Sequence, residues 1–272
     1  MNDLTREKAL AALRWLVECG ADEATGDTPV NRLIASTPEP PPVPAPTARS
    51  VVREPPVTRM LRQEPVKNEV PAANSNAIAA ACGSLEELKA ALATFDGCEL
   101  KRHATNLVFA DGNPSGGIML IGEAPGADED RQGLPFVGRA GQLLDRMLAA
   151  IGLNRQKVYI TNIVNWRPPG NREPSPEEAA IFLPFLHRHI ELANPKLLVL
   201  LGAVPVRHLT GLQGILRHRG RWESYRCQTS GREVPVMLTL HPAYLLRQPA
   251  AKRLAWQDLT AISQRAKSLG LA

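Results

Sequence analysis

The sequence predicts an α/β fold, a three-layer αβα arrangement with a central, mostly parallel four-stranded sheet. Apolar runs of strand length alternate with helical patterns over the C-terminal two-thirds of the 272 residues. Such alternation is typical of parallel sheets, because crossover helices join neighbouring strands and cover both faces. Polar, glycine-containing segments follow several strand-like runs, where ligands bind in such folds. We expect strands at 117–121, 158–164, 196–201 and 234–240, and helices at 85–93, 140–151, 176–193, 203–209 and 250–267.

Residues 1–20 predict a short amphipathic helix, followed by Gly20 where a C-terminal cap is expected. An isolated helix of this length is marginal in water. We therefore expect it to pack on the main domain or to dock on a protein partner. Its apolar stripe consists of Leu4, Leu10, Leu13, Leu16 and Val17.

Residues 21–83 are expected to form a Pro-rich disordered linker. Eleven of the 24 prolines lie in the stretch Pro29–Pro71, which has few clustered apolar residues. The linker is followed by Ser84-x-x-Glu87, the pattern of a capping box that opens a helix. One compact domain is therefore predicted over 84–272. Between its last two strands we expect a polar insertion at 217–232.

Charge is unevenly distributed along the chain. The formal net charge is +5, and the excess of Lys and Arg lies in residues 97–272, whereas residues 1–96 are slightly acidic. A basic folded domain suits a polyanionic partner such as nucleic acid. No segment has the length and apolarity of a membrane span, and the N-terminus lacks the pattern of a signal peptide. We expect a cytoplasmic monomer that makes no contact with a membrane.

The four cysteines, Cys19, Cys82, Cys98 and Cys227, include no C-x-x-C pair. Their spacing predicts neither a zinc site nor a disulfide framework, so we expect reduced thiols.

Three strand ends are expected to meet in one crevice. Gly122–Gly126 follows the first strand, Asn162 lies in the second, and His241-Pro242 follows the last. Because the carboxyl ends of parallel strands lie at one edge of a sheet, these residues are candidates for a common binding site.

Five short motifs fall in the predicted domain: Gly122-Glu-Ala-Pro-Gly126, Pro135-Phe-Val-Gly138, Ile160-Thr-Asn162, Arg167-Pro-Pro-Gly-Asn171 and His241-Pro-Ala-Tyr-Leu-Leu-Arg247. In this order they strongly resemble the uracil-DNA glycosylase superfamily, and most closely its family-four branch. The resemblance spans about residues 97–262. It implies an enzyme that flips uracil out of DNA and hydrolyses the N-glycosidic bond, which leaves an abasic site in base excision repair.

A flipped base needs a stacking ring and a group that reads its Watson–Crick edge. Phe136 is expected to stack, although a core role is equally compatible with its sequence position. The amide of Asn162 can donate to O4 and accept from N3 of uracil. By resemblance, His241 donates a ring N–H to O2 and so stabilises the negative charge that develops on the departing base.

The loop Gly122–Gly126 is expected to line the base pocket through Gly122, Ala124, Pro125 and Gly126. The best-known branch of the superfamily has aspartate at Ala124 and tyrosine at Gly126. Glu123 is then the nearest carboxylate and the first candidate for orienting water, and Glu129 is the second. A purely structural role for Glu123, in which it hydrogen bonds the backbone of the turn, stays open.

The segment after His241 resembles the wedge that fills the hole left by the flipped nucleotide. Leu245 is the first choice for that wedge, and Arg247 is expected near a phosphate. Arg217 and Arg221 are expected to make further phosphate contacts. Leu245 as a core residue and the basic loop as a solvated surface are the alternatives.

Family-four members normally ligate an iron–sulfur cluster with four cysteines. At the corresponding positions this chain has Phe95, Cys98, Trp166 and Phe182, so only Cys98 matches a ligand. We expect no cluster, no other metal, and a hydrophobic plug in its place.

The motifs favour a monofunctional glycosylase without a lyase step, because they contain no lysine that forms a Schiff base. The alternative is a glycosylase-derived module that binds uracil or abasic DNA with little turnover.

Overall fold

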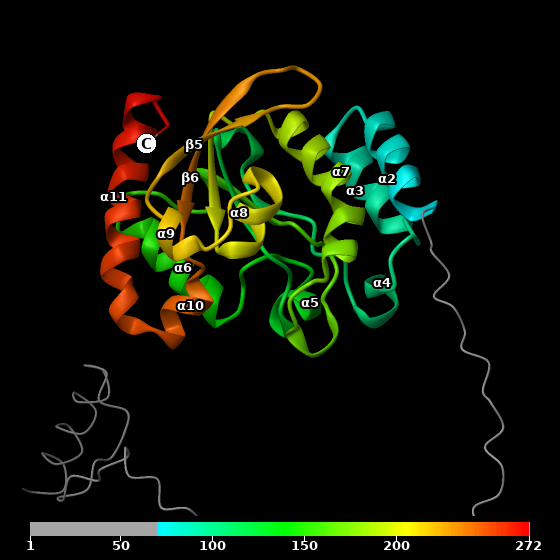
Figure 1. Ribbon diagram of the computed structural model, residues 1–272, viewed down its shortest axis with the longest axis horizontal. Helices are drawn as coiled ribbons and strands as arrows, with labels where there is room; N and C mark the ends of the chain where they lie inside the picture. Colours follow the sequence, from blue (N-terminus) through cyan, green and yellow to red (C-terminus); the bar gives the residue numbers. More distant parts are fainter. Residues whose placement is uncertain (1–69, 272) are drawn as a thin grey trace, which may run out of the picture. The chain divides into compact units, whose positions relative to one another are not determined.

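The computed structural model describes residues 70–271, which form a six-stranded sheet between two layers of helices (Figure 1). The strand order is β1-β3-β2-β4-β6-β5. The four central strands, β3, β2, β4 and β6, are parallel to one another, which confirms the predicted, mostly parallel sheet. Their bounds are Ile118–Gly122 for β2, Val158–Asn162 for β3, Leu197–Leu201 for β4 and Glu233–Thr239 for β6.

Two antiparallel edge strands were not predicted. β1 (Asp111–Gly112) has two residues and pairs with β3. β5 (Trp222–Arg226) lies in the segment that we expected to be a polar insertion, and it pairs with β6. Only Tyr225 of β5 is buried, because an edge strand keeps one face in solvent. Such strands are too short or too polar to give an apolar run.

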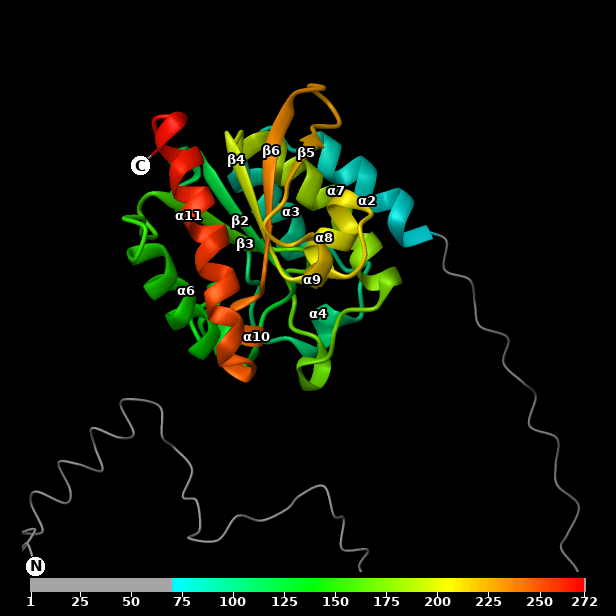
Figure 2. The same cartoon turned by 60° about the vertical axis from the view of Figure 1, so that its left-hand side comes forward.

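The central strands alternate side chains between two cores. Met119 and Ile121 of β2 point to one core, whereas Ile118 and Leu120 point to the other. The first core is covered by α2 (Val70–Ala81), α3 (Leu85–Thr94), α7 (Pro176–Ala193) and α8 (Ala203–Thr210). The second is covered by α6 (Arg139–Ala149) and α11 (Lys252–Ser268). Figure 2 shows these two groups on opposite sides of the sheet, which confirms the three-layer arrangement.

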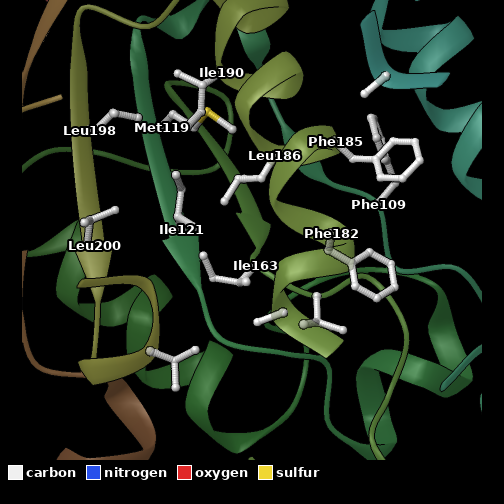
Figure 3. Close-up of a cluster of buried hydrophobic side chains, with 14 of the residues drawn as sticks. Phe109, Met119, Ile121, Ile163, Phe182, Phe185, Leu186, Ile190, Leu198 and Leu200 are labelled. Carbon is white, nitrogen blue, oxygen red and sulfur yellow. The ribbon is translucent and has the colours of Figure 1, made fainter. Parts of the chain in front are cut away.

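Helix α7 forms the centre of the first core. Its residues Leu186 and Ile190 lie over strands β2 and β4, and Phe182 and Phe185 point toward the outer helices (Figure 3). The helix begins with a capping box, in which Ser175 Oγ accepts from Glu178 N at 3.2 Å and Glu178 Oε2 accepts from Ser175 N at 2.8 Å.

Helix α2 corrects the boundary of the expected linker. The linker was predicted to reach residue 83, but a helix spans Val70–Ala81 and packs on α7. Arg188 of α7 donates a hydrogen bond to the Cys82 carbonyl at 2.8 Å, which ties the end of α2 to the domain. The helix is rich in alanine and has only a weak apolar stripe, so its pattern was missed. The predicted helix at 1–20 and residues 21–69 lie outside the described residues.

Half of the capping box predicted at Ser84 is present: Glu87 N donates to Ser84 Oγ at 3.1 Å, but the Glu87 carboxylate accepts from Gly83 N at 2.6 Å and not from Ser84 N. Among residues 70–271, no helix is long and apolar enough to cross a membrane.

The remaining short elements are α4 (Leu100–His103), η1 (Pro114–Gly116), α5 (Ala127–Gln132), η2 (Pro169–Asn171), α9 (Ile215–His218), α10 (Pro242–Arg247) and η3 (Pro249–Ala251).

Candidate active site

A cavity of about 530 Å³ opens at the carboxyl ends of the parallel strands. Its walls come from the loop after β2, the end of β3, the loop before α7 and the start of α10. The predicted residues that line it are Glu123, Ala124, Pro125, Gly126, Glu129, Phe136, Asn162, His241 and Arg247. The structure therefore brings residues from the three predicted strand ends together in one cavity.

Gly122 was expected to line the pocket, but it is not among the residues that line the cavity; instead it lies against two side chains that do line it. A Cβ atom at this position would overlap Asn162 Oδ1 and would lie 2.5 Å from Phe136 Cζ. Gly122 is also the register partner of Asn162 in the parallel pair β2 and β3. Glycine at this position lets the amide and the ring approach each other across the strand end.

Phe136 is buried and belongs to the second core, so its ring serves core packing and lines the cavity at once. The ring centroid lies 5.5 Å from that of His241, at an interplanar angle of 32°. Its backbone has φ 56°, in the left-handed region that phenylalanine seldom adopts.

The Asn162 side chain is 3% exposed. Among residues 70–271 its amide has no hydrogen-bond partner, although it lines the cavity. Because the amide faces the cavity and makes no hydrogen bond to the described protein, both its oxygen and its NH2 group can bind a ligand.

His241 is the N-cap of α10, and its Nδ1 accepts a hydrogen bond from Ala243 N at 3.1 Å. An accepting ring nitrogen carries no proton, so the neutral ring has its proton on Nε2. Burial lowers the pKa of His241 to about 4, and the charge of Arg247 acts in the same direction. At neutral pH the imidazole is therefore uncharged, with an Nε2–H that no residue of the described chain accepts.

Glu123 places a carboxylate in the cavity wall. Burial raises its pKa, Glu173 raises it further, and Arg207 and Arg247 lower it. Within residues 70–271 its carboxylate accepts no hydrogen bond from the turn, so the structural alternative considered for Glu123 is not what the geometry shows. Arg207 pairs with Glu173 at 2.8 Å.

Glu129 performs the structural role instead. One carboxylate oxygen accepts from Gly126 N at 3.1 Å, and the other accepts from Val137 N at 2.9 Å and Gly138 N at 2.8 Å. These bonds tie the loop after β2 to the Phe136 loop. With both oxygens occupied, Glu129 is not a free base, although it lines the cavity.

Leu245 needs a correction, because it is 1% exposed and lies in the second core. A buried residue of this kind cannot fill a gap in DNA without leaving the core, so the core alternative fits the structure. The next residue, Leu246, is only partly buried, and Arg247 is exposed and lines the cavity. The sequence does not show which of the two leucines faces the core, because this depends on how α10 is rotated relative to that core.

The exposed side chains of Arg217 and Arg221 do not line the cavity. The segment that carries them is anchored by Arg219, whose guanidinium pairs with the buried carboxylate of Asp258 on α11. Thr239 at the end of β6 donates to the same carboxylate at 2.8 Å. Arg217 and Arg221 are thus presented by a fixed loop.

The sequence reasoning missed several residues of the cavity wall. Ala140, Asn171, Arg172, Glu173 and Ala243 all contribute to it. Asn171 closes the quoted motif that begins at Arg167, and its Oδ1 accepts from Arg167 Nε at 2.7 Å. The motif could have indicated Asn171 as a site residue, but its position in the same cavity as Glu123 depends on the fold of the loop before α7.

The four positions that correspond to cluster ligands are buried in one core. Phe95, Cys98, Trp166 and Phe182 are each at most 6% exposed. Phe95 packs edge-on against Phe185, with ring centroids 5.2 Å apart. Large side chains occupy three positions, and one thiol remains, so these residues do not fit a cluster with four thiolate ligands.

Fold and site together define an α/β protein that presents an aromatic ring, an amide and a neutral imidazole in one cavity at the carboxyl ends of its parallel strands. Residues 109–260 match the family model of the uracil DNA glycosylase superfamily. The chain belongs to that superfamily.

Two of the relatives below carry a uracil-DNA glycosylase name, and a third is named as a DNA polymerase. A Type-4 uracil-DNA glycosylase of Pyrobaculum aerophilum is 38% identical over 64% of this chain and 91% of its own length. One of Thermotoga maritima is 38% identical over 63% of this chain and 86% of its own. A DNA polymerase of Bacillus phage SP01 is 29% identical over 59% of this chain, but over only 17% of its own length.

Proposed function

We propose that this chain is a uracil-DNA glycosylase that flips uracil from DNA and hydrolyses its N-glycosidic bond, leaving an abasic site for base excision repair. One observation carries the proposal: a single cavity holds Phe136, the unpaired amide of Asn162 and the neutral imidazole of His241. The relatives named Type-4 uracil-DNA glycosylase support the same reaction.

Base recognition is assigned to Asn162. Its NH2 group donates to uracil O4 and its Oδ1 accepts from N3–H, while the Phe136 ring stacks on the base. Cytosine presents an amino donor in place of O4 and has no hydrogen at N3, so it mismatches both contacts. Cytosine would therefore leave both groups of the amide unpaired, and this cost favours uracil.

Bond cleavage is assigned to His241 and Glu123. The Nε2–H of the neutral imidazole donates to uracil O2, where negative charge grows as the bond to the sugar breaks. The Glu123 carboxylate orients the attacking water and stabilises the positive charge of the sugar. Glu129 holds the two loops in place through its three backbone contacts.

Glu123→Gln is expected to lower the single-turnover excision rate about 100-fold or more, because the amide cannot accept a proton from water. Wild-type activity is expected to fall at acid pH as Glu123 is protonated, and this loss begins above the ordinary range because the pKa of Glu123 is raised. Rates over pH 4 to 8, measured for both proteins, test the role.

Glu173→Gln is the matched control, because it removes the negative neighbour that raises the pKa of Glu123. The acid limb should then move to lower pH. An unchanged acid limb in Glu123→Gln would remove this residue from the water-activating role.

DNA contact is assigned to Leu246 and Arg247 beside the cavity, with Arg217 and Arg221 as additional phosphate contacts. Arg217→Gln and Arg221→Gln are each expected to weaken binding uniformly across sequences and to reduce the salt slope of the affinity by about 1. Arg226→Gln is the control, because this exposed arginine lies at the end of β5 beside the amino end of β6, opposite the strand ends that form the cavity. Equal salt slopes for all three variants would place the basic loop outside the DNA interface.

We propose that the enzyme works without an iron–sulfur cluster, because Phe95, Trp166 and Phe182 fill the place of three ligands. Protein purified without oxygen should contain no stoichiometric iron and show no broad visible absorbance. Cys98→Ala should leave excision unchanged, since a thiol that binds no metal contributes only packing. Stoichiometric iron in the wild type, lost in Cys98→Ala, would contradict the proposal.

Activity is tested with an oligonucleotide that carries one uracil. Incubation followed by alkali should break the strand at that position, whereas incubation alone should leave it intact, because none of the described residues that line the cavity is a lysine that could form a Schiff base. Tight binding without strand breakage after alkali would instead support a module that holds uracil or abasic DNA.

A further inference from the structure

The Phe136 loop is held in a conformation that needs an external restraint. Phe136 has φ 56°, which is unfavourable for a residue with a bulky side chain. This conformation turns its ring toward Gly122 and its carbonyl away from the cavity, as the contacts on each side show. The restraint on that carbonyl therefore decides where the ring lies.

Arg155 supplies such a restraint from the turn before β3. Its Nη1 donates to the Pro135 carbonyl at 3.1 Å, and its Nη2 donates to the Phe136 carbonyl. A planar guanidinium presents these donors in a fixed fork, which a lysine ammonium does not. Two consecutive carbonyls of the loop are thereby held by one side chain.

Arg155 is itself fixed by two carboxylates. Its Nε donates to Asp145 of α6 at 2.9 Å, and its Nη1 also pairs with Asp111 of β1. The arginine side chain is 25% exposed, so these contacts are partly shielded from water. The guanidinium is thus anchored on a strand and a helix rather than on a mobile loop.

Helix α6 closes the other side of the same carbonyl. A Cβ atom at Gly141 would overlap the Phe136 carbonyl oxygen, so only glycine allows this approach. Arg155 and Gly141 together leave the carbonyl little room to move.

We propose that Arg155 is a positioning residue for base recognition: it holds Phe136 in its left-handed conformation and thereby places the stacking ring. Arg155 touches neither base nor sugar. The inference rests on the proposed function, because it assigns Phe136 to uracil stacking.

The test is a double-mutant cycle on the affinity for free uracil. The affinity is measured by titration of uracil, monitored in 1H–15N NMR spectra, and this measurement requires no turnover. Phe136→Ala is expected to weaken uracil binding about fivefold or more, the effect of losing one base–aromatic stack. Arg155→Gln should weaken it by a similar factor. The double variant should bind uracil no more weakly than Phe136→Ala alone, because Arg155 acts through that ring.

Arg232→Gln is the matched control. Its Nη1 also donates to a backbone carbonyl, that of Pro195 at 2.7 Å, but at the amino end of β6. It should bind uracil like the wild type. If Arg155→Gln does not fold, Arg155→Lys enters the same cycle, since it keeps the charge and loses the fork.

Three results separate the outcomes. Wild-type affinity in the Arg155 variant, or losses that multiply in the double variant, would overturn the positioning role while uracil excision by the wild type continued. Failure of the wild type to bind or excise uracil would instead overturn the proposed function, and the positioning role with it.

Discussion

His241→Ala is expected to lower the single-turnover rate of uracil excision about 100- to 1000-fold, the usual effect of removing one donor to a developing anion. The lost group is the Nε2–H, which is fixed as the donor because Nδ1 accepts from Ala243 N. Affinity for uracil-containing DNA should change much less, since the interaction strengthens only as the bond breaks. Rapid-quench measurement with excess enzyme checks the rate.

His241→Asn separates the donor from the helix cap. Asparagine at the N-cap still accepts from the backbone of α10, whereas the path to its NH2 group is one atom shorter than the path to imidazole Nε2, so this group does not reach uracil O2. This variant should therefore lose less stability than His241→Ala, which forfeits about 1 kcal/mol of capping. Both should excise uracil equally slowly. His103→Ala, on exposed α4, serves as the control for a change of histidine outside the cavity. Wild-type excision by His241→Asn would contradict the leaving-group role.

Acid pH provides a further check on the same residue. The pKa of His241 is lowered to about 4 in the folded protein, so its neutral state persists through neutral and mildly acid pH. In the unfolded chain the ordinary pKa of about 6.5 applies. Stability from neutral His241 is therefore fully present above that value and declines as pH falls toward 4.

Asn162→Asp is expected to lower kcat/KM for uracil about 100-fold or more, because a carboxylate cannot donate to O4 and places negative charge beside that oxygen. The ratio of uracil to cytosine excision should fall even further, since a carboxylate accepts from the cytosine amino group. Parallel assays on oligonucleotides with uracil or cytosine at one position measure both effects.

Asn154→Asp is the matched control for this change. Asn154 is exposed, and its Oδ1 accepts from Gln156 N at 3.1 Å, a bond that aspartate also makes. Its kinetics should equal those of the wild type. If Asn162→Asp kept the wild-type preference for uracil, base recognition would lie elsewhere in the cavity.

Most of the fold could be predicted from local patterns of apolar residues. The apolar runs of β2 and β4 are buried on both faces, so they stand out as continuous stretches. The edge strands β1 and β5 lack this signal because one face meets solvent or because the strand is only two residues long. Helix α2 was not predicted, because it follows a proline-rich segment and its many alanines give no clear apolar stripe.

The site was predictable where short motifs follow strands. Glu123, Asn162 and His241 could be placed this way, because the carboxyl ends of parallel strands lie at one edge of the sheet. The role of Arg155 was not, because its contacts with Asp111 and Phe136 join segments far apart in sequence. The tautomer of His241 likewise depends on one backbone N–H of the folded chain.

Direct detection of the released base tests the central claim. Wild-type protein in excess over an oligonucleotide with one uracil should release one equivalent of free uracil, identified by liquid chromatography and mass spectrometry, and no free cytosine from a matched oligonucleotide with cytosine at that position. The same assay with His241→Asn should release uracil at least about 100-fold more slowly. A complex that retains intact uracil DNA in the wild type would contradict the assignment of this chain as a uracil-DNA glycosylase.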